Sequence, residues 1–325
     1  MDCPNSTRRA VLAGLGALTA APAMASVCAK SRANLAPLQD AMANGRFIAY
    51  QPTALKAIDG QLTHASDNSI RADLNVLRPW FDSLITYGVT AGGERIPDIA
   101  ASLKFRSVIL GVWDPSNETE ISNAVAAWKR NPQLVNGISL GNEIVFGKRG
   151  TWADLAKYLA QVRARAPGAA LTVSETFAEY LDHPESKLAL AQMDFMLANV
   201  HPAFEPWFKT APPYNWADFV VKVTARLSSA FCGPVLVKET GVPSGPASAS
   251  FTENAQAAFW RALEKQFPRS PERAFAYFTA FDAPWRTNDF NPVAGPHPEE
   301  AHWGLFTEDR RPKLVIAALP KLKNY

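Results

Sequence analysis

The stretch Gly137-Ile-Ser-Leu-Gly-Asn-Glu143 is a short apolar run that ends in an amide and a carboxylate side by side. A second stretch, Pro234-Val-Leu-Val-Lys-Glu-Thr-Gly-Val-Pro-Ser244, has the same layout: a β-branched apolar run, then Glu239, then a Gly/Pro/Ser turn. Each pattern predicts a buried strand that the chain leaves abruptly after its glutamate. The two stretches therefore place two carboxylates at the ends of two different strands.

Outside these stretches, compact apolar segments alternate with segments of helical periodicity such as residues 69–81. We expect strands at residues 47–50, 84–87, 107–113, 138–143, 170–175, 195–200, 235–239 and 274–281. In these segments the residues at odd and at even positions, which point to opposite faces of a strand, are both apolar. They are therefore typical of strands covered on both faces, and they predict a single-domain (β/α)8 TIM barrel. The alternative is a doubly wound sheet, which would want a glycine-rich turn after the first strand, where this chain has Gln51-Pro52.

Two helix starts carry capping residues. Asn117 and Glu120 have the spacing of a capping box, and Thr151 is the expected N-cap of the helix that follows the strand 138–143.

The first residues are not expected to belong to the fold. Ser6-Thr-Arg-Arg-Ala-Val-Leu12 places adjacent arginines before an apolar run, and Ala23-Met-Ala25 has the small-x-small pattern of a cleavage site. We interpret residues 1–25 as a twin-arginine-type signal peptide and residues 26–325 as the mature domain. The run is too short for a stable membrane anchor, and Cys28 is not the first mature residue, so a soluble periplasmic or secreted protein is expected.

The overall charge is nearly balanced, with 33 basic and 30 acidic residues and a net charge of +3, and no like-charge block points to nucleic acid. Neither a zinc-type Cys/His spacing nor a phosphate-binding glycine fingerprint is present, so no metal or cofactor is expected. Cys28 and Cys232 form either one disulfide or two buried thiols. A monomer is expected.

Two glutamates at the ends of separate barrel strands suit glycoside hydrolysis. One carboxyl protonates the leaving oxygen while the other attacks the sugar carbon or activates water, so both must converge on one bond. In a parallel barrel the carboxyl ends of the strands meet at one face, where Glu143 and Glu239 would lie together. We interpret Glu143 as the proton donor.

From about Phe47 onward the chain resembles glycoside hydrolase family 17, the β-1,3-glucanases and related transferases of clan A. The resemblance rests on Gly141-Asn-Glu143, Asn199-Val-His-Pro202, Lys238-Glu-Thr-Gly-Val-Pro-Ser244, Phe278-Thr-Ala-Phe-Asp-Ala-Pro-Trp285 and His302-Trp-Gly-Leu-Phe306. It implies that Glu143 is the acid/base and Glu239 the nucleophile of a retaining mechanism. It further implies that Asn142 bonds the sugar's 2-hydroxyl and that Trp285 is the platform under the reacting sugar.

Two positions depart from the family pattern. Better-known members have a small residue in place of Lys238 and Trp or Tyr in place of Val242, which affects the expected subsite shape and substrate length. A lysine at a barrel strand end also raises Schiff-base chemistry. Strand alternation predicts otherwise, because if Glu239 points inward, Lys238 points toward the helix layer or the rim.

A third glutamate competes for the nucleophile role. Val173-Ser-Glu-Thr176 imitates the motif around Glu239 at the end of the neighbouring expected strand. Glu175 lacks the Gly-x-Pro-Ser turn that follows Glu239, so we favour Glu239 as nucleophile. Glu175 is then a sugar ligand or a residue that tunes the pKa of the acid.

Several rings stand at or just beyond strand ends, where flat faces can stack on sugars. These candidates are Tyr50, Tyr87, Trp113, Phe204, Trp207 and Trp285. Packing in the core explains each ring equally well. His201 is either a ligand of a sugar hydroxyl or a core histidine, and the hairpin-like segment 301–312 is either a cleft wall or simple packing.

Together these observations predict an exported barrel that cleaves β-1,3-glucan with retention and competing transglycosylation, with Phe204 and Trp207 as the acceptor platform. One alternative is a glucan-binding or sensing barrel that has lost turnover. The other is a Schiff-base lyase or aldolase that uses Lys238.

Overall fold

The computed structural model describes residues 33–58, 61–288 and 297–323 of the 325-residue chain. The expected signal peptide, residues 1–25, and Cys28 lie outside these residues. Cys232 is disulfide-bonded. No helix among the described residues is both long and apolar enough to cross a membrane.

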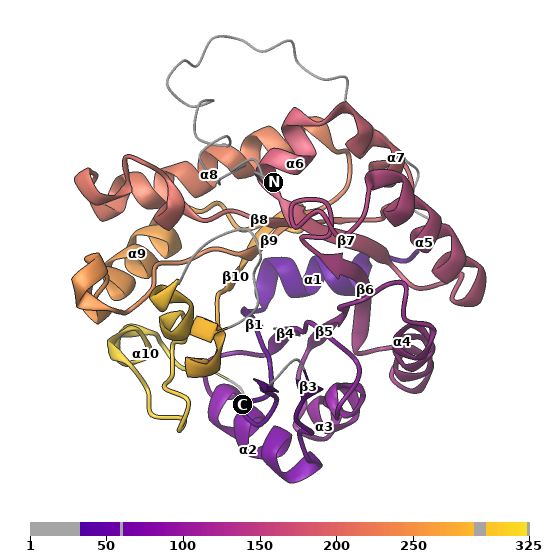
Figure 1. Ribbon diagram of the computed structural model, residues 1–325, viewed down its shortest axis with the longest axis horizontal. Helices are drawn as coiled ribbons and strands as arrows, with labels where there is room; N and C mark the ends of the chain where they lie inside the picture. The colour runs from indigo at the N-terminus through magenta and orange to yellow at the C-terminus, as the bar shows by residue number, and fades with distance from the viewer. Residues whose placement is uncertain (1–32, 59–60, 289–296, 324–325) are drawn as a thin grey trace, which may run out of the picture.

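Eight parallel strands close into a barrel in the order β1-β10-β9-β8-β7-β6-β5-β4 (Figure 1). The strands are β1 (Phe47–Ala49), β4 (Ser83–Ile85), β5 (Ser107–Val112), β6 (Val135–Asn142), β7 (Leu171–Thr176), β8 (Met196–Asn199), β9 (Val235–Glu239) and β10 (Arg273–Tyr277). The ring closes where Phe47 of β1 pairs with Ala276 of β10. The predicted (β/α)8 TIM barrel is confirmed, and the doubly wound alternative is wrong.

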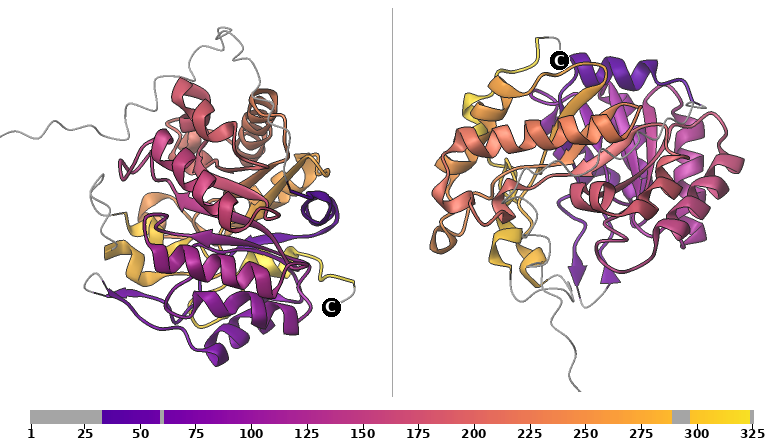
Figure 2. Two further views of the ribbon diagram at one scale, coloured as in Figure 1. Left: turned by 90° about the vertical axis from the view of Figure 1, so that its right-hand side faces the viewer. Right: turned by 90° about the horizontal axis from the view of Figure 1, so that it is seen from above.

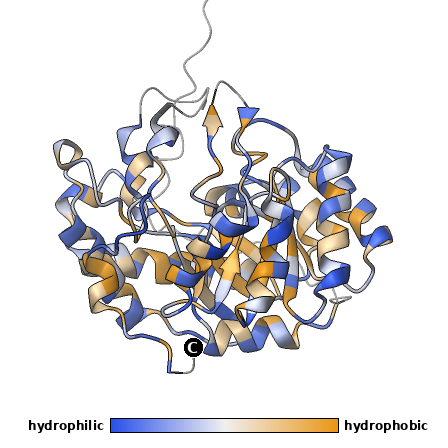
Figure 3. Cartoon of the chain, turned by 90° about the horizontal axis from the view of Figure 1, so that it is seen from below, coloured by the Kyte–Doolittle hydropathy of each residue, from blue (hydrophilic) through white to orange (hydrophobic). Residues whose placement is uncertain are grey.

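Helices surround the barrel on its outside (Figures 1 and 2). They are α2 (Asp67–Leu77), α3 (Ile96–Ser102), α4 (Glu118–Arg130), α5 (Trp152–Arg165), α6 (Phe177–Asp182), α7 (Lys187–Leu190), α8 (Pro213–Ala230), α9 (Glu253–Gln266) and α10 (Leu314–Ala318). Every residue of β5 and of β9 is buried, as expected for strands covered on both faces. Figure 3 shows hydrophobic residues on the strands, and hydrophobic and hydrophilic residues alternating along the surrounding helices.

One further helix, α1 (Ala36–Asn44), precedes the barrel and was not expected from the sequence. Its buried residues Leu38 and Met42 join Phe47 and Phe195, which stand where β1 and β8 begin, in one apolar cluster. The amino-terminal end of the barrel is therefore covered, which leaves the chemistry to the carboxyl ends of the strands.

The capping predictions were partly right. Thr151 and Asp154 form a full capping box at the start of α5. Asn117 caps α4, but the carboxylate of Glu120 does not return to its backbone. It accepts instead from the backbone N–H groups of Val89, Trp113 and Asp114, and so joins the loops that follow β4 and β5.

Two segments near the rim differ from expectation. The last strand ends at Tyr277 rather than at 281, and Phe281 then forms an isolated bridge with Phe306. In the segment 301–312, Trp303, Leu305 and Phe306 are buried, so its aromatic density reflects packing against the barrel. The small hairpin of β2 (Ala57–Ile58) and β3 (Gln61–Leu62) was not expected.

Candidate active site

Glu143 and Glu239 lie on the carboxyl-terminal face of the barrel. Glu239 is the last residue of β9, and Glu143 directly follows β6, where its backbone N–H still donates to Ser174 O at 2.8 Å. Glu143 has a φ of +53°, a conformation that a residue with a side chain seldom adopts and that concentrates at functional sites. Gly141 precedes it at a φ of +82°, and a Cβ there would meet the Ile144 side chain at 2.4 Å.

The Glu143 carboxyl is half-buried and accepts a hydrogen bond from a neutral amide. Its Oε1 accepts from Nδ2 of Asn199 at 3.0 Å. Burial raises the pKa of Glu143, and the negative charge of Glu239 raises it further, while the Asn199 hydrogen bond opposes both. This carboxyl is suited to begin a reaction protonated.

The Glu239 carboxylate, 6% exposed, is surrounded by donors from three other positions. Its Oε1 accepts from the Tyr87 phenol at 3.0 Å and lies 3.2 Å from Nζ of Lys238, and its Oε2 lies 3.5 Å from Nε2 of His201. Burial alone would raise the pKa of Glu239, but the Lys238 charge, followed by His201, lowers it to about 2. Between about pH 2 and the raised pKa of Glu143, Glu239 is therefore an anion while Glu143 is still protonated.

Lys238 does not point toward the helix layer, so that prediction was wrong. The side chain is 2% exposed, and its Nζ donates to Oδ1 of Asn142 at 2.5 Å and to Oγ of Ser174 at 3.2 Å. The pairing of β8 with β9 shifts register here, so simple alternation fails at the strand end. The flexible four-carbon stem then carries the ammonium to the acceptors.

The Asn142 amide is fixed by three donors on one atom. Besides Lys238, Oγ of Ser174 at 3.1 Å and Nδ2 of Asn199 at 3.4 Å reach Oδ1 of Asn142. Asn199 ends β8, and Ser174 lies two residues before the end of the neighbouring strand β7; neither residue received a role from the sequence. Their polar side chains near strand ends were the available signal.

Glu175 is completely buried, which contradicts the prediction of a sugar ligand. Its two carboxylate oxygens accept from the backbone N–H groups of Val145 at 2.8 Å and Phe146 at 3.3 Å. Burial raises the pKa of Glu175 to about 8, the Val145 hydrogen bond lowers it, and the charge of Glu143 raises it. Glu175 thus braces the loop that carries Glu143.

The two candidate tyrosines, Tyr50 and Tyr87, differ in whether they reach the site. Tyr87 is half-buried, and its hydroxyl bonds Glu239 while its ring lies 4.3 Å from Nζ of Lys238. Tyr50 is 0% exposed, donates to Oδ2 of Asp73 at 2.9 Å and packs edge-on against Phe281. The prediction that Tyr50 contacts sugar was wrong, because the ring follows the end of β1 and turns toward α2.

The other candidate rings keep part of their surface exposed. Phe204 and Trp207 are half-buried and form T-shaped pairs with Trp303 and with Phe219 of α8, at centroid distances of 5.8 and 5.4 Å. Trp285 is half-buried in the 3₁₀ turn Pro284–Asn288. Trp113 is 47% exposed at the end of β5.

His201 lies in the site, against the edges of several rings. Its ring centroid is 5.6 Å from that of Phe204, 5.2 Å from that of Phe278 and 5.1 Å from that of Trp303. Nδ1 of His201 has no hydrogen-bond partner among the described residues. His201 is thus packed against rings like a core histidine, and its Nε2 lies 3.5 Å from Oε2 of Glu239.

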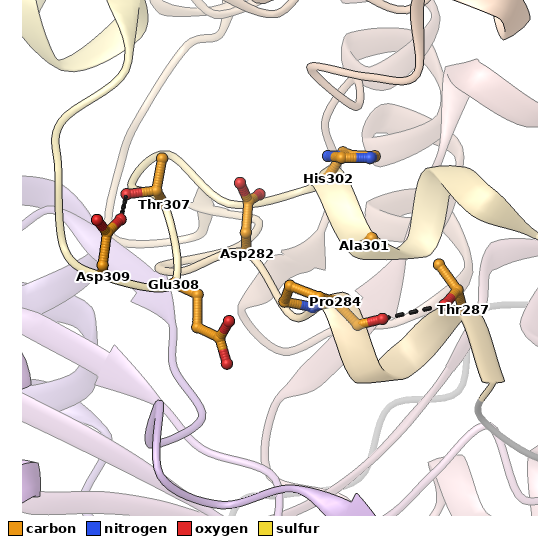
Figure 4. Close-up of a pocket in the computed structure, with 8 residues that line it drawn as sticks. All are labelled: Asp282, Pro284, Thr287, Ala301, His302, Thr307, Glu308 and Asp309. Atoms are coloured by element: carbon orange, nitrogen blue, oxygen red, sulfur yellow. Dashed lines mark hydrogen bonds between the residues drawn. The ribbon is translucent and has the colours of Figure 1, made fainter.

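A cavity of about 420 Å³ is lined by Asp282, Pro284, Thr287, Ala301, His302, Thr307, Glu308 and Asp309 (Figure 4). Neither Glu143 nor Glu239 lines it. Asp282 pairs with Lys313 and Glu308 with Lys56, so these carboxylates are engaged in ion pairs. Among the described residues, no group of three or more His, Cys, Asp or Glu side chains is placed to hold a metal ion.

Residues 48–304 match the family described as the BtgE/BtgC glycoside hydrolase domain. The chain is 27% identical over 277 residues to a glucan 1,3-β-glucosidase of Arthroderma benhamiae, an alignment that spans 80% of this chain and 87% of that protein. It is 23% identical over 256 residues to a Saccharomyces cerevisiae protein named "Probable family 17 glucosidase", spanning 75% of this chain and 61% of that protein.

Solved structures of the same fold include two glucan-active proteins. A glycoside hydrolase family 17 β-1,3-glucanosyltransferase from Rhizomucor miehei has a TM-score of 0.62 at 20% identity, covering 83% of this chain and 96% of that chain. An active-site mutant of it was solved in complex with laminaritriose. An endo-laminarinase from Formosa has a TM-score of 0.66 at 20% identity, covering 85% and 86%.

Proposed function

The chain belongs to the BtgE/BtgC glycoside hydrolase family, of the family 17 kind, and on that premise we propose that it cleaves and transfers β-1,3-linked glucosyl units with retention of configuration. Glu143 is the acid/base and Glu239 the nucleophile. The names of the relatives support the substrate, since one is a glucan 1,3-β-glucosidase and one fold neighbour was solved with laminaritriose.

The observation that carries this proposal is the opposite tuning of the two strand-end glutamates. Burial and a neighbouring negative charge raise the pKa of Glu143, while an ammonium lowers the pKa of Glu239 to about 2. A pair of carboxyls whose pKa values are pushed apart in this way supplies an acid and an anion at one pH. A barrel that only binds glucan has no need of this division.

In the first half-reaction the Glu239 carboxylate attacks the anomeric carbon as the bond to the leaving oxygen breaks. Glu143 gives its proton to that oxygen, and the leaving sugar departs from a glucosyl ester on Glu239. Ester formation removes the negative charge of Glu239. The pKa of Glu143 then falls, because that charge was one cause of its elevation.

In the second half-reaction Glu143 acts as a base. It takes a proton from water or from a sugar hydroxyl, whose oxygen attacks the anomeric carbon, breaks the bond between that carbon and Glu239, and releases Glu239 as a carboxylate. Asn142 lies next to Glu143 and is held by three donors, so it presents a fixed amide to the sugar 2-hydroxyl. Water gives hydrolysis and a second sugar gives transfer.

Products of laminaripentaose, followed by ¹H NMR from the first minutes, test the proposal. We expect β-configured reducing ends before mutarotation. Initial α-configured products would overturn the covalent mechanism, and no cleavage of β-1,3-linked oligosaccharides would overturn the substrate.

We also propose that residues 1–25 direct export and that the mature enzyme acts in the periplasm or outside the cell. The disulfide at Cys232 suits an oxidising compartment. Amino-terminal sequencing of the protein recovered from the extracytoplasmic fraction should begin at Ser26. A chain that keeps residues 1–25 and stays in the cytosol would contradict this.

A further inference from the structure

Lys238 is a buried cation with acceptors on several sides. Its Nζ lies 2.5 Å from Oδ1 of Asn142, 3.2 Å from Oγ of Ser174 and 3.2 Å from Oε1 of Glu239. The face of the Tyr87 ring lies 4.3 Å away. Burial of an ammonium is costly unless carboxylates and hydrogen-bond acceptors surround it, and this side chain has both.

The Lys238 ammonium fixes which atom of the Asn142 amide faces it. An ammonium carries donors only, so the facing atom must be the oxygen, and Ser174 and Asn199 reach that same oxygen. The amide N–H₂ of Asn142 is thereby turned away from the three donors. Among the described residues it donates to no protein group, so it is available to a sugar hydroxyl.

We propose that Lys238 is a positioning residue of the reaction, whose ammonium keeps Glu239 a carboxylate and turns the Asn142 N–H₂ toward the substrate. This inference rests on the proposed function, because it assigns work to Lys238 through the nucleophile. Lys238 itself does not touch the sugar, since its side chain is 2% exposed.

Other groups also face Glu239 and must be weighed. The charged or titratable ones are Tyr87, Glu143, His201, Lys238 and Arg286. Glu143 opposes ionisation, and Tyr87 donates a neutral hydrogen bond. His201 faces Glu239 through Nε2 at 3.5 Å, and its Nδ1 is buried without a hydrogen-bond partner among the described residues. Arg286 is shared with Glu300, with which it pairs at 2.9 Å.

Three variants separate the charge from the hydrogen bond. Lys238→Met removes both, and Lys238→Gln removes the charge but leaves an N–H that can reach Oδ1 of Asn142. Lys313→Met is the matched control, because Lys313 is likewise buried and pairs with Asp282 at 2.6 Å, outside the catalytic pair. All three are expected to lose stability.

The pH profile of kcat/KM on laminaripentaose tells these variants apart. The profile of the wild type should be bell-shaped on the acid side of neutrality, and its acid limb should report ionisation of Glu239. In Lys238→Met and Lys238→Gln the acid limb should move up by about one pH unit or more, while Lys313→Met should leave it in place. An unmoved limb in both Lys238 variants would reduce Lys238 to a structural role.

The proposed orientation of the Asn142 amide is tested by a separate measurement. An aryl β-glucoside and its 2-deoxy analogue differ only in the hydroxyl that Asn142 is proposed to bond. Lys238→Met should lower kcat/KM for the glucoside about tenfold more than Lys238→Gln does, and this gap should close on the 2-deoxy substrate. A gap of equal size on both substrates would refute the orientation of Asn142.

A measurement without substrate keeps this inference separable from the proposed function. The Glu239 carboxyl carbon, assigned by comparison with Glu239→Gln, can be titrated by ¹³C NMR in the wild type and in Lys238→Gln. We expect the Glu239 pKa to rise in the variant even if the wild type cleaves no β-1,3-glucan, in which case only the proposed function fails. If the wild type cleaves with retention and Glu239 titrates identically in both proteins, the role of Lys238 fails alone.

Discussion

Glu175 and Glu239 stand in nearly the same local sequence, Val173-Ser-Glu-Thr176 and Val237-Lys-Glu-Thr240, each at the end of a barrel strand. Their surroundings are nevertheless opposite. Glu175 accepts from two backbone N–H groups, whereas Glu239 accepts from a phenol and lies beside an ammonium.

The difference shows that a charged donor decides whether a buried carboxyl is ionised. Burial raises the pKa of both groups, and neutral backbone donors leave that of Glu175 at about 8. The charge of Lys238, with help from His201, overcomes burial at Glu239 and brings its pKa to about 2. The two four-residue motifs differ in the residue before the glutamate, Ser174 against Lys238, and Glu239 also has a contact with His201, which follows β8.

The strongest test of the difference between Glu175 and Glu239 is to replace each of them with alanine. Glu239→Ala should lose turnover on glucan and on aryl glucosides alike, by about 10⁴-fold or more, because no ester can form. Glu175→Ala should retain far more of it. Azide added to Glu239→Ala with an activated β-glucoside should yield an α-glucosyl azide. If Glu175→Ala is the dead variant, the two roles must be exchanged.

The next largest effect is expected from Glu143, the proposed acid. Glu143→Ala should depress cleavage of natural glucan by about 10²–10⁴-fold, since the leaving oxygen then departs without a proton. A dinitrophenyl leaving group needs no proton, so the first step on that substrate should be nearly normal and the burst of dinitrophenolate should persist. Equal losses on both substrates would contradict the acid role of Glu143.

A smaller effect, on stability, sharpens the comparison without any substrate. Glu175 has a raised pKa, so its contribution to the free energy of unfolding is full below about pH 4.3 and is lost as the pH rises through about 8. Glu239 has a lowered pKa, so its contribution is present above about pH 4.3 and is lost as the pH falls through about 2.

Denaturant unfolding of Glu175→Gln and Glu239→Gln between pH 2 and pH 9 measures the contribution of each glutamate to the free energy of unfolding. Relative to Glu175→Gln, the wild type should weaken from pH 4.3 to pH 8, and relative to Glu239→Gln it should weaken from pH 4.3 to pH 2. Each change should be on the order of a few kcal/mol. Parallel trends in the two variants would mean that both carboxyls lie in similar environments.

The barrel was predictable because its signal is local. A strand covered on both faces needs apolar residues in succession, and the runs 108–110 of β5 and 235–237 of β9 supply them. The carboxyl-end rule of parallel barrels then put Glu143 and Glu239 on one face. Helix α1 escaped this reasoning, since an alanine-rich segment is compatible with many conformations until Leu38 and Met42 find the barrel end.

The errors in the site have tertiary causes. The direction of Lys238 depends on a register shift between β8 and β9, which no property of β9 alone encodes. Tyr50 was misjudged because its partner, Asp73, lies on a separate helix. The burial of Glu175 likewise follows from the loop after Glu143, which closes over it.

The smallest expected effect is on the partition of the Glu239 ester between water and sugar. Phe204 and Trp207 follow β8, two strands from β6 in the barrel order, whereas Trp113 follows β5, the neighbour of β6 on its other side. We expect Trp207→Ala to lower the share of products longer than the starting laminari-oligosaccharide by about 2–10-fold, the change that about 0.5–1.5 kcal/mol of stacking produces. Total donor consumption should change less, because the ester forms before the acceptor binds.

The measurement is a time course at high oligosaccharide concentration, in which longer products form early and then decline. Trp113→Ala is the matched control, since it removes a tryptophan that is 47% exposed from the other side of Glu143. If Trp113→Ala lowers transfer and Trp207→Ala does not, the acceptor lies over β5, and Trp207 only packs against Phe219.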